Sequence, residues 1–224
     1  MIWNRLAIGT ANWGKEYNGS QVGKEEQKDI LDYCKELGID TIDTATAYEW
    51  DWTEIDPYFK VVLKVRASDD IENLPDAWCI MAHESEAVNR CLKMYSKYPY
   101  WGISLYKPET DNMPNVFQVP YSLYDRRFER FISGWADDVI IHVRSIFLRG
   151  KVLEKVYPHE AISFCLMNPN VNKVIIGVDS FEQLQENLEP FRHWDSLQET
   201  DLDIIDCRRW KDGQGKTSSI KSSE

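Results

Sequence analysis

Eight short apolar runs alternate with longer polar or amphipathic stretches along this chain, and this alternation restricts the fold more than any other feature. Such a pattern is typical of α/β proteins, in which parallel strands are joined by crossover segments. Runs such as Val139 to Val143 (VIIHV) and Lys173 to Gly177 (KVIIG) are almost wholly apolar, as expected of strands buried on both faces. The predicted strands are residues 5–9, 41–44, 59–65, 78–82, 101–105, 116–119, 139–143 and 173–177.

Helical periodicity is clearest in the segment 24–37, where apolar side chains recur at helical spacing and Gly38 follows as a helix stop. Further helices are predicted from the fourth strand to about Lys97 and from Ser180 to Leu188. Two other connections have room only for a loop or one helical turn, namely those between Thr44 and Phe59 and between Trp101 and Val119. The pattern predicts a compact (β/α)8 TIM barrel with an incomplete outer ring of helices.

The length of 224 residues fits one such barrel, which usually needs about 250 residues. Hydrophobic residues make up 43% of the chain and charged residues 28%, an ordinary balance for a globular domain. We interpret residues 1–210 as a single barrel domain. Residues 211–224 are polar and free of aromatic side chains, and we expect them to form a disordered tail.

Charge and cysteine content exclude several classes of function. The net charge of −11 offers no basic face for a nucleic-acid backbone. Five cysteines without a CxxC pair predict neither a disulfide framework nor a metal site, and reduced thiols fit a cytoplasmic protein. The first residues lack the layout of a signal peptide, and no apolar run approaches the roughly 20 residues of a membrane span, so no membrane partner is expected.

Four ionisable residues stand out by their position. Asp43 ends the second predicted strand, Tyr48 follows it, Lys64 lies near the end of the third strand, and His83 directly follows the fourth. The C-terminal ends of the strands converge on one mouth of a (β/α)8 barrel, where active sites lie. We therefore expect these four side chains to meet in space.

This combination suits the reduction of a carbonyl group, which needs a hydride on carbon and a proton on oxygen. Tyr48 would supply the proton, and the Lys64 ammonium would favour the phenolate that remains. Asp43 would hold Lys64 in place and keep it charged. His83 would bind the substrate oxygen and orient it towards Tyr48.

The order and spacing of several motifs resemble the aldo-keto reductases over about residues 6–188. The strand-two segment IDTIDTATAY carries Asp43 and Tyr48, and the strand-four segment MAHESE carries His83. The other matching segments are LAIGTANWGKEYNG, WGISLYKPE, FQVPYSLYDRRF, VRSIFLRGKV and VIIGVDSFEQLQENL.

The resemblance implies a catalytic tetrad of Asp43, Tyr48, Lys64 and His83 and a site for NADPH, with NADH as the alternative. The nicotinamide end would lie near Gly9, Thr10 and Asp43. The remaining cofactor contacts implied are Ser104 and Gln118 at the carboxamide, Tyr121 as the stacking ring, Arg144, Ser145, Ile146 and Phe147 along the pyrophosphate, and Gly177, Ser180, Gln183 and Asn187 around the adenosine.

The sequence departs from the family pattern in several segments that bear on the site. The segment EWDWTEIDPY replaces the family's helix after the tyrosine. Asp179 and Gln183 stand where members often place Arg or Lys against the 2′-phosphate of NADPH, and a carboxylate there repels a phosphate dianion. NADH is therefore kept as an option. The segment after Gly150 is also short, and without a loop to hold the cofactor we expect it to bind more weakly or to exchange faster.

Other residues have plainer interpretations. Trp13, Trp50 and Trp52 fall in loops at the predicted mouth, where we expect some contact with substrate. The acidic run from Asp69 to Glu72 is interpreted as a solvated helix start, and His142 as a structural residue.

Two alternatives to a reductase stay open on the sequence alone. One is a degenerate barrel that binds a nucleotide or a partner without catalysis. The other is a lyase or isomerase that uses Lys64 as a Schiff base. The resemblance implies a small-molecule carbonyl substrate. The sequence identifies neither this substrate nor the oligomeric state.

Overall fold

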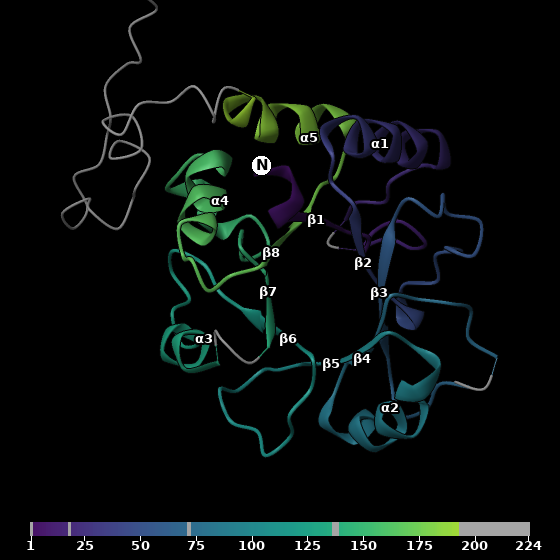
Figure 1. Ribbon diagram of the computed structural model, residues 1–224. Helices are drawn as coiled ribbons and strands as arrows, with labels where there is room; N and C mark the ends of the chain where they lie inside the picture. The colour runs from purple at the N-terminus through teal and green to yellow at the C-terminus, as the bar shows by residue number, and fades with distance from the viewer. Residues whose placement is uncertain (1, 18, 71–72, 136–138, 193–224) are drawn as a thin grey trace, which may run out of the picture.

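Eight parallel strands close into a barrel in the computed structural model, which describes residues 2–17, 19–70, 73–135 and 139–192 (Figure 1). Each strand pairs with its neighbours in sequence, and β8 pairs with β1 to complete the ring. The predicted fold class is confirmed, and every strand boundary lies within one residue of its predicted place. The strands are β1 (Leu6–Gly9), β2 (Thr41–Ala45), β3 (Lys60–Val65), β4 (Cys79–Ala82), β5 (Tyr100–Ser104), β6 (Val116–Pro120), β7 (Ile140–Arg144) and β8 (Lys173–Gly177).

The outer ring of helices is incomplete, as predicted. The α-helices are α1 (Lys24–Leu37), α2 (Val88–Met94), α3 (Glu129–Trp135), α4 (Pro158–Leu166) and α5 (Phe181–Leu188). Over the described ranges no α-helix follows β2, β3 or β5, and loops flank β2 and β3 on the right of Figure 1. The helices of this part of the chain are also too short or too polar to cross a membrane.

Short 3-10 turns complete the connections. They are η1 (Trp3–Arg5), η2 (Thr46–Tyr48), η3 (Ser85–Ala87), η4 (Tyr95–Lys97), η5 (Lys151–Glu154) and η6 (Glu189–Phe191). The turn η4 extends α2 to the predicted end near Lys97. The predicted tail, residues 211–224, and the end of the predicted domain lie outside the described residues.

Helix α1 occupies the predicted segment and ends at Gly38 because this residue adopts a left-handed conformation with φ of 86°. Its buried residues, Ile30 and Cys34 among them, pack into the core. Helix α5 lies beside α1 (Figure 1), and Ser180 caps its first turn by accepting a hydrogen bond from the Gln183 N–H at 3.1 Å. A glycine thus ends α1, and a polar cap begins α5.

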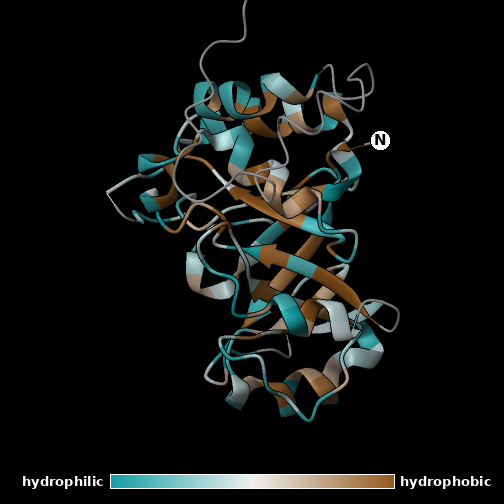
Figure 2. Ribbon diagram, turned by 90° about the vertical axis from the view of Figure 1, so that its left-hand side faces the viewer, coloured by the Kyte–Doolittle hydropathy of each residue, from teal (hydrophilic) through white to brown (hydrophobic). Residues whose placement is uncertain are grey.

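Side chains alternate between two faces along each strand, and the two faces build separate apolar clusters. The outward residues pack against the helices in a large cluster, whereas the inward residues form a smaller one made of Val62, Cys79, Met81 and Val116. Figure 2 shows the strands as mainly brown ribbons interrupted by teal, because polar residues share the interior with this apolar cluster.

The floor of the barrel is held by an ion triad. Asp40, just before β2, accepts hydrogen bonds from Lys60 and from Lys173, each at 2.7 Å. Although partial burial raises the pKa of Asp40, the two ammonium groups and a hydrogen bond from Thr41 outweigh it and hold that pKa well below its usual range. The triad therefore joins β3 and β8 through the start of β2.

Candidate active site

A polar layer fills the barrel above the inward apolar cluster, at the C-terminal ends of the strands. Each of its members lies two residues beyond another inward residue, so strand alternation directs it to the same interior. These members are Lys64 after Val62, His83 after Met81, Ser104 after Gly102, Gln118 after Val116 and Arg144 after His142.

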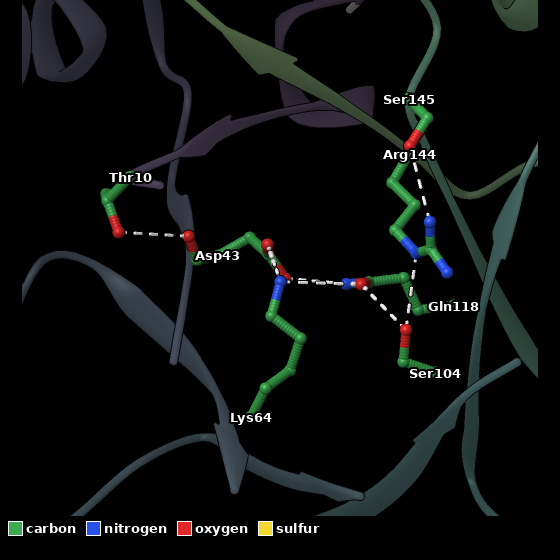
Figure 3. Close-up of polar contacts among 7 residues, drawn as sticks. All are labelled: Thr10, Asp43, Lys64, Ser104, Gln118, Arg144 and Ser145. Carbon is green, nitrogen blue, oxygen red and sulfur yellow. Dashed lines mark hydrogen bonds and ion pairs between the residues drawn. The ribbon is translucent and has the colours of Figure 1, made fainter. Parts of the chain in front are cut away.

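Lys64 and Asp43 form a buried ion pair at the centre of this layer (Figure 3). Only 3% of the Lys64 side chain and 5% of the Asp43 side chain are exposed. The Gln118 amide donates to the second carboxylate oxygen of Asp43 at 2.6 Å, and its own oxygen receives Lys64 at 3.5 Å. The carboxylate and the ammonium are therefore held by one another and by Gln118.

Tyr48 closes one side of this pair. The Lys64 ammonium lies 5.2 Å from the centre of the Tyr48 ring. Hydrogen bonding with Tyr48 helps to raise the pKa of Lys64. Burial lowers the pKa of Lys64, but the Asp43 carboxylate and the Tyr48 phenol outweigh it and raise that pKa above its ordinary value. Lys64 therefore stays positively charged.

His83 completes the group around Tyr48. The two rings meet edge to face, with centroids 6.4 Å apart and an interplanar angle of 87°. Burial lowers the pKa of His83 to about 4, and the nearby cations Lys64, Arg66 and Arg144 act in the same direction. The imidazole is therefore neutral at pH 7 and can donate a hydrogen bond without adding a charge.

The turn that carries Tyr48 is followed by a loop instead of an α-helix, and contacts on both of its sides hold it in place. Gly14 packs directly on this turn. A Cβ at Gly14 would lie 2.2 Å from the Glu49 carbonyl carbon and 2.3 Å from the backbone carbonyl oxygen of Tyr48. Lys15 pairs with Glu49 at 2.9 Å. On the other side, the Thr46 hydroxyl donates to Asp69.

Residues 66–69 form a second fixed turn, between β3 and β4. The Asp69 carboxylate also accepts the Arg66 N–H at 2.7 Å, and Glu84 accepts the Ala67 N–H at 3.1 Å. The Arg90 guanidinium donates to the carbonyl groups of Ala67 and Asp69. The interpretation of Asp69 as the start of a solvated helix is therefore wrong, because its carboxylate joins this turn to the turn of Tyr48.

Several predicted cofactor residues border the polar layer. The Ser104 hydroxyl donates to the Gln118 oxygen at 3.4 Å and accepts from the Arg144 guanidinium at 3.2 Å (Figure 3). Arg144 also reaches Ser145 at 3.3 Å. Gly9 ends β1, and Thr10 donates its N–H and its hydroxyl to the Asp43 carbonyl oxygen at 3.0 and 3.2 Å.

The predicted adenosine residues gather where β8 leads into α5. Gly177 is exposed at the end of β8, and a Cβ added to it would meet no atom within 4 Å. Ser180 and Gln183 lie in the cap of α5, where the Gln183 side chain accepts the Asp179 N–H at 2.8 Å. Asn187, in contrast, is buried, with 3% exposed.

Three residues expected along the cofactor face away from the mouth. Tyr121 shares the outward face with Val119, is 2% exposed, and stacks on Phe164 of α4 at 5.1 Å. The side chain of Ile146 is buried in the outer core, and Phe147 packs against that core. The assignment of Tyr121 as the stacking ring is therefore wrong, since its faces are covered by protein.

Two of the three tryptophans expected at the substrate are buried instead. Trp13 and Trp52 lie in the outer core, with 2% and 7% exposed, and are not substrate contacts. Trp50 meets Trp13 edge to face at 4.8 Å and donates its indole N–H to Gln27 of α1 at 3.0 Å. Trp50 itself is half-buried, and its contact with substrate stays a prediction.

Sequence comparison gives no relative for this chain: no protein-family model matches it, and neither does any curated protein. Comparison of structures does, and it identifies the fold as that of the aldo-keto reductases, which confirms the resemblance at the level of the fold.

Three solved structures illustrate this similarity. A protein of Pseudomonas aeruginosa assigned to the aldo-keto reductases has 18% identity and a TM-score of 0.68, over 83% of this chain and 88% of its own. A thermostable aldo-keto reductase bound to the inhibitor epalrestat has 17% identity and a TM-score of 0.63, over 90% and 93%. The holo form of an aldo-keto reductase from Bacillus halodurans has 18% identity and a TM-score of 0.63, over 84% and 86%.

Proposed function

We propose that this protein is a nicotinamide-dependent oxidoreductase that reduces an aldehyde or ketone to an alcohol. The observation that carries the proposal is the buried ammonium of Lys64, which is fixed by Asp43 on one side and meets Tyr48 on the other. A charged lysine held beside a phenol at the mouth of a barrel has a clear use in proton donation.

The residues around Gln118 suit the carboxamide of a nicotinamide. Among the described residues, the Gln118 oxygen is engaged by two long contacts, at 3.4 Å from Ser104 and 3.5 Å from Lys64, so it can accept an amide N–H. The Ser104 hydroxyl is a second partner on the same face. A bound nicotinamide cofactor would supply the hydride.

The chain's own residues would handle the proton. Tyr48 donates its hydroxyl proton to the carbonyl oxygen as negative charge builds there. Lys64 stabilises the phenolate that remains, and Asp43 keeps the ammonium in position. His83, neutral at pH 7, donates a hydrogen bond to the same oxygen and orients it.

The choice between NADPH and NADH depends on the residues around the adenosine. NADPH is the cofactor that the resemblance implies, but Asp179 presents a carboxylate near α5 that would oppose a 2′-phosphate. Asp179 accepts a hydrogen bond from Asn12 at 3.1 Å, which keeps this carboxylate in place. We therefore propose NADPH binding of modest strength with NADH as the alternative, and a submicromolar dissociation constant for NADPH would contradict this.

The alternatives are less well supported. A Schiff-base lysine must lose its proton to act as a nucleophile, whereas the Lys64 pKa is raised. A barrel that only binds a nucleotide has no need of a buried ammonium between a carboxylate and a phenol. Cofactor binding without any turnover would nevertheless favour that alternative.

The test is a Tyr48→Phe variant assayed with a panel of small aldehydes at the nicotinamide absorbance. We expect kcat to fall roughly 10²- to 10⁴-fold because the proton donor is lost. The dissociation constants of NADPH and NADH, followed by tryptophan fluorescence, should stay close to wild type. Wild-type turnover in the variant would show that Tyr48 is not the acid.

A further inference from the structure

Arg66 lies at the mouth of the barrel, next to the histidine of the candidate site. It is two residues beyond Lys64, so strand alternation directs both side chains towards the mouth. The β3–β4 ladder ends with Val65 opposite Ala82, and the His83 N–H donates to the Val65 oxygen at 2.9 Å. Arg66 and His83 are therefore the next neighbours across the two strands, which lie about 4.8 Å apart in such a sheet.

The backbone at Arg66 is fixed, but its guanidinium is exposed and has no ion-pair partner in the part of the chain that the structure describes. Three carboxylates of the described loops at this end of the barrel have partners other than the Arg66 guanidinium. Asp69 accepts the Arg66 N–H and the Thr46 hydroxyl, Glu84 accepts the Ala67 N–H, and Glu49 pairs with Lys15. A rigid turn therefore presents a cation with its hydrogen-bond donors available.

Cations gather around His83, although the whole chain carries −11. Lys64, Arg66 and Arg144 all lower the pKa of His83, and Lys64 is paired with Asp43. Arg144 is already engaged, since its guanidinium donates to Ser104 and to the Leu105 oxygen and lies 4.6 Å from the centre of the Tyr106 ring. Arg66 is thus the cation best placed to receive a ligand.

We propose that the substrate is an aldehyde or ketone that also carries a carboxylate, and that Arg66 binds this carboxylate while the carbonyl oxygen meets Tyr48 and His83. A guanidinium binds a carboxylate through two parallel hydrogen bonds and so fixes its orientation as well as its position. This inference rests on the proposed reductase function and names the class of substrate that the function serves.

The experiment compares kcat/KM for 4-carboxybenzaldehyde and its neutral isostere 4-formylbenzamide at pH 7. We expect the wild-type protein to prefer the carboxylate by about 10- to 100-fold, the range of a charge-assisted hydrogen-bonded pair. The preference should shrink as salt is added, because a partly exposed ion pair is screened. In Arg66→Gln the ratio of the two values should fall towards one.

Two further variants sharpen the result. Arg66→Glu should favour 4-(trimethylammonio)benzaldehyde over the carboxylate, reversing the wild-type order. Arg130→Gln removes an exposed arginine of α3 and should keep the wild-type preference. The melting temperature of each variant shows whether it is folded.

Equal kcat/KM for the two aldehydes in the wild-type protein, or an unchanged preference in Arg66→Gln, would overturn the proposal and leave the reductase function standing. Weaker NADPH binding in Arg66→Gln would also overturn it, since Arg66 would then serve the cofactor. If the wild-type protein reduces no carbonyl compound at all, the proposed function itself fails, and the substrate class fails with it.

Discussion

His142 illustrates how burial controls charge at the scale of a single residue. It lies inside the barrel, is 1% exposed, and stacks on Trp78 with the ring centroids 6.2 Å apart. Neither ring nitrogen has a hydrogen-bond partner among the residues that the structure describes. Burial lowers the pKa of His142 to about 3, and Lys173 and Lys64 add to the effect. The ring therefore stays neutral, which agrees with a structural role.

This neutral ring predicts a loss of stability in acid. In the unfolded chain a histidine takes up a proton near pH 6.5, whereas native His142 does so only near pH 3. Between these values the unfolded state binds more protons than the native state. From this residue alone, the free energy of unfolding should therefore fall by about 1.4 kcal/mol for each unit by which the pH is lowered.

Urea unfolding of the wild-type protein and of His142→Leu from pH 7 to pH 4 measures this contribution. The variant should lose less stability over that range, since leucine fills the site and takes up no proton. His83 contributes in both proteins and cancels in the comparison. Equal slopes would mean that His142 is protonated in the native state.

Single residues also show where sequence reasoning succeeds and where it fails. Lys64 and His83 could be assigned to the mouth because Lys64 lies near the end of one clear strand and His83 directly follows another. Tyr121 could not be oriented from its motif alone, but counting by two from Phe117 and Val119 would have placed it on the outward face. The same count from Lys64 would have directed attention to Arg66.

The turns around Tyr48 are the elements on which the candidate site most depends. Gly14→Ala would bring a Cβ to 2.2 Å from the Glu49 backbone, so the two segments would have to separate. We expect a loss of about 1–3 kcal/mol in stability. Turnover should fall at least roughly tenfold, because displacement of Tyr48 misaligns the proton donor.

Gly134→Ala provides the matched control for this variant. Gly134 lies within α3, and a Cβ there meets no atom within 4 Å. This change should stabilise the protein by about 0.4–1 kcal/mol and leave turnover alone. Thermal unfolding and the aldehyde assay measure both variants, and a Gly14→Ala protein with wild-type values would show that the contact is not needed.

Elements differed in how well the sequence predicted them, for physical reasons. Strands such as β3 and β8 were predictable because they are nearly continuous apolar runs, whereas β2 (TIDTA) is more polar. Helix α4 was missed because seven of its nine residues are buried, which removes the polar face that reveals a helix. Helix α3 has only seven residues, too few for its periodicity to stand out.

At the scale of the whole molecule, the described residues up to position 192 contain the complete ring of eight strands. All eight strands and both apolar clusters lie within residues 2–192. We therefore expect a chain that ends after Trp210 to unfold in one transition, with a melting temperature within about 2 °C of the full chain. Calorimetry of the two proteins tests this, and a much lower melting temperature would move the domain boundary beyond Trp210.

The hydrogen bond from Gln118 to Asp43 joins β6 to β2, strands on opposite sides of the ring that share no backbone ladder. Replacing Asp43 or Gln118 therefore removes a connection across the lumen as well as a chemical group. Ligand affinities measured on such variants would mix two effects, recognition and slackening of the scaffold. Tyr48 takes no part in this bond, which makes its phenylalanine variant the better inactive stand-in for trapping a complete complex with substrate.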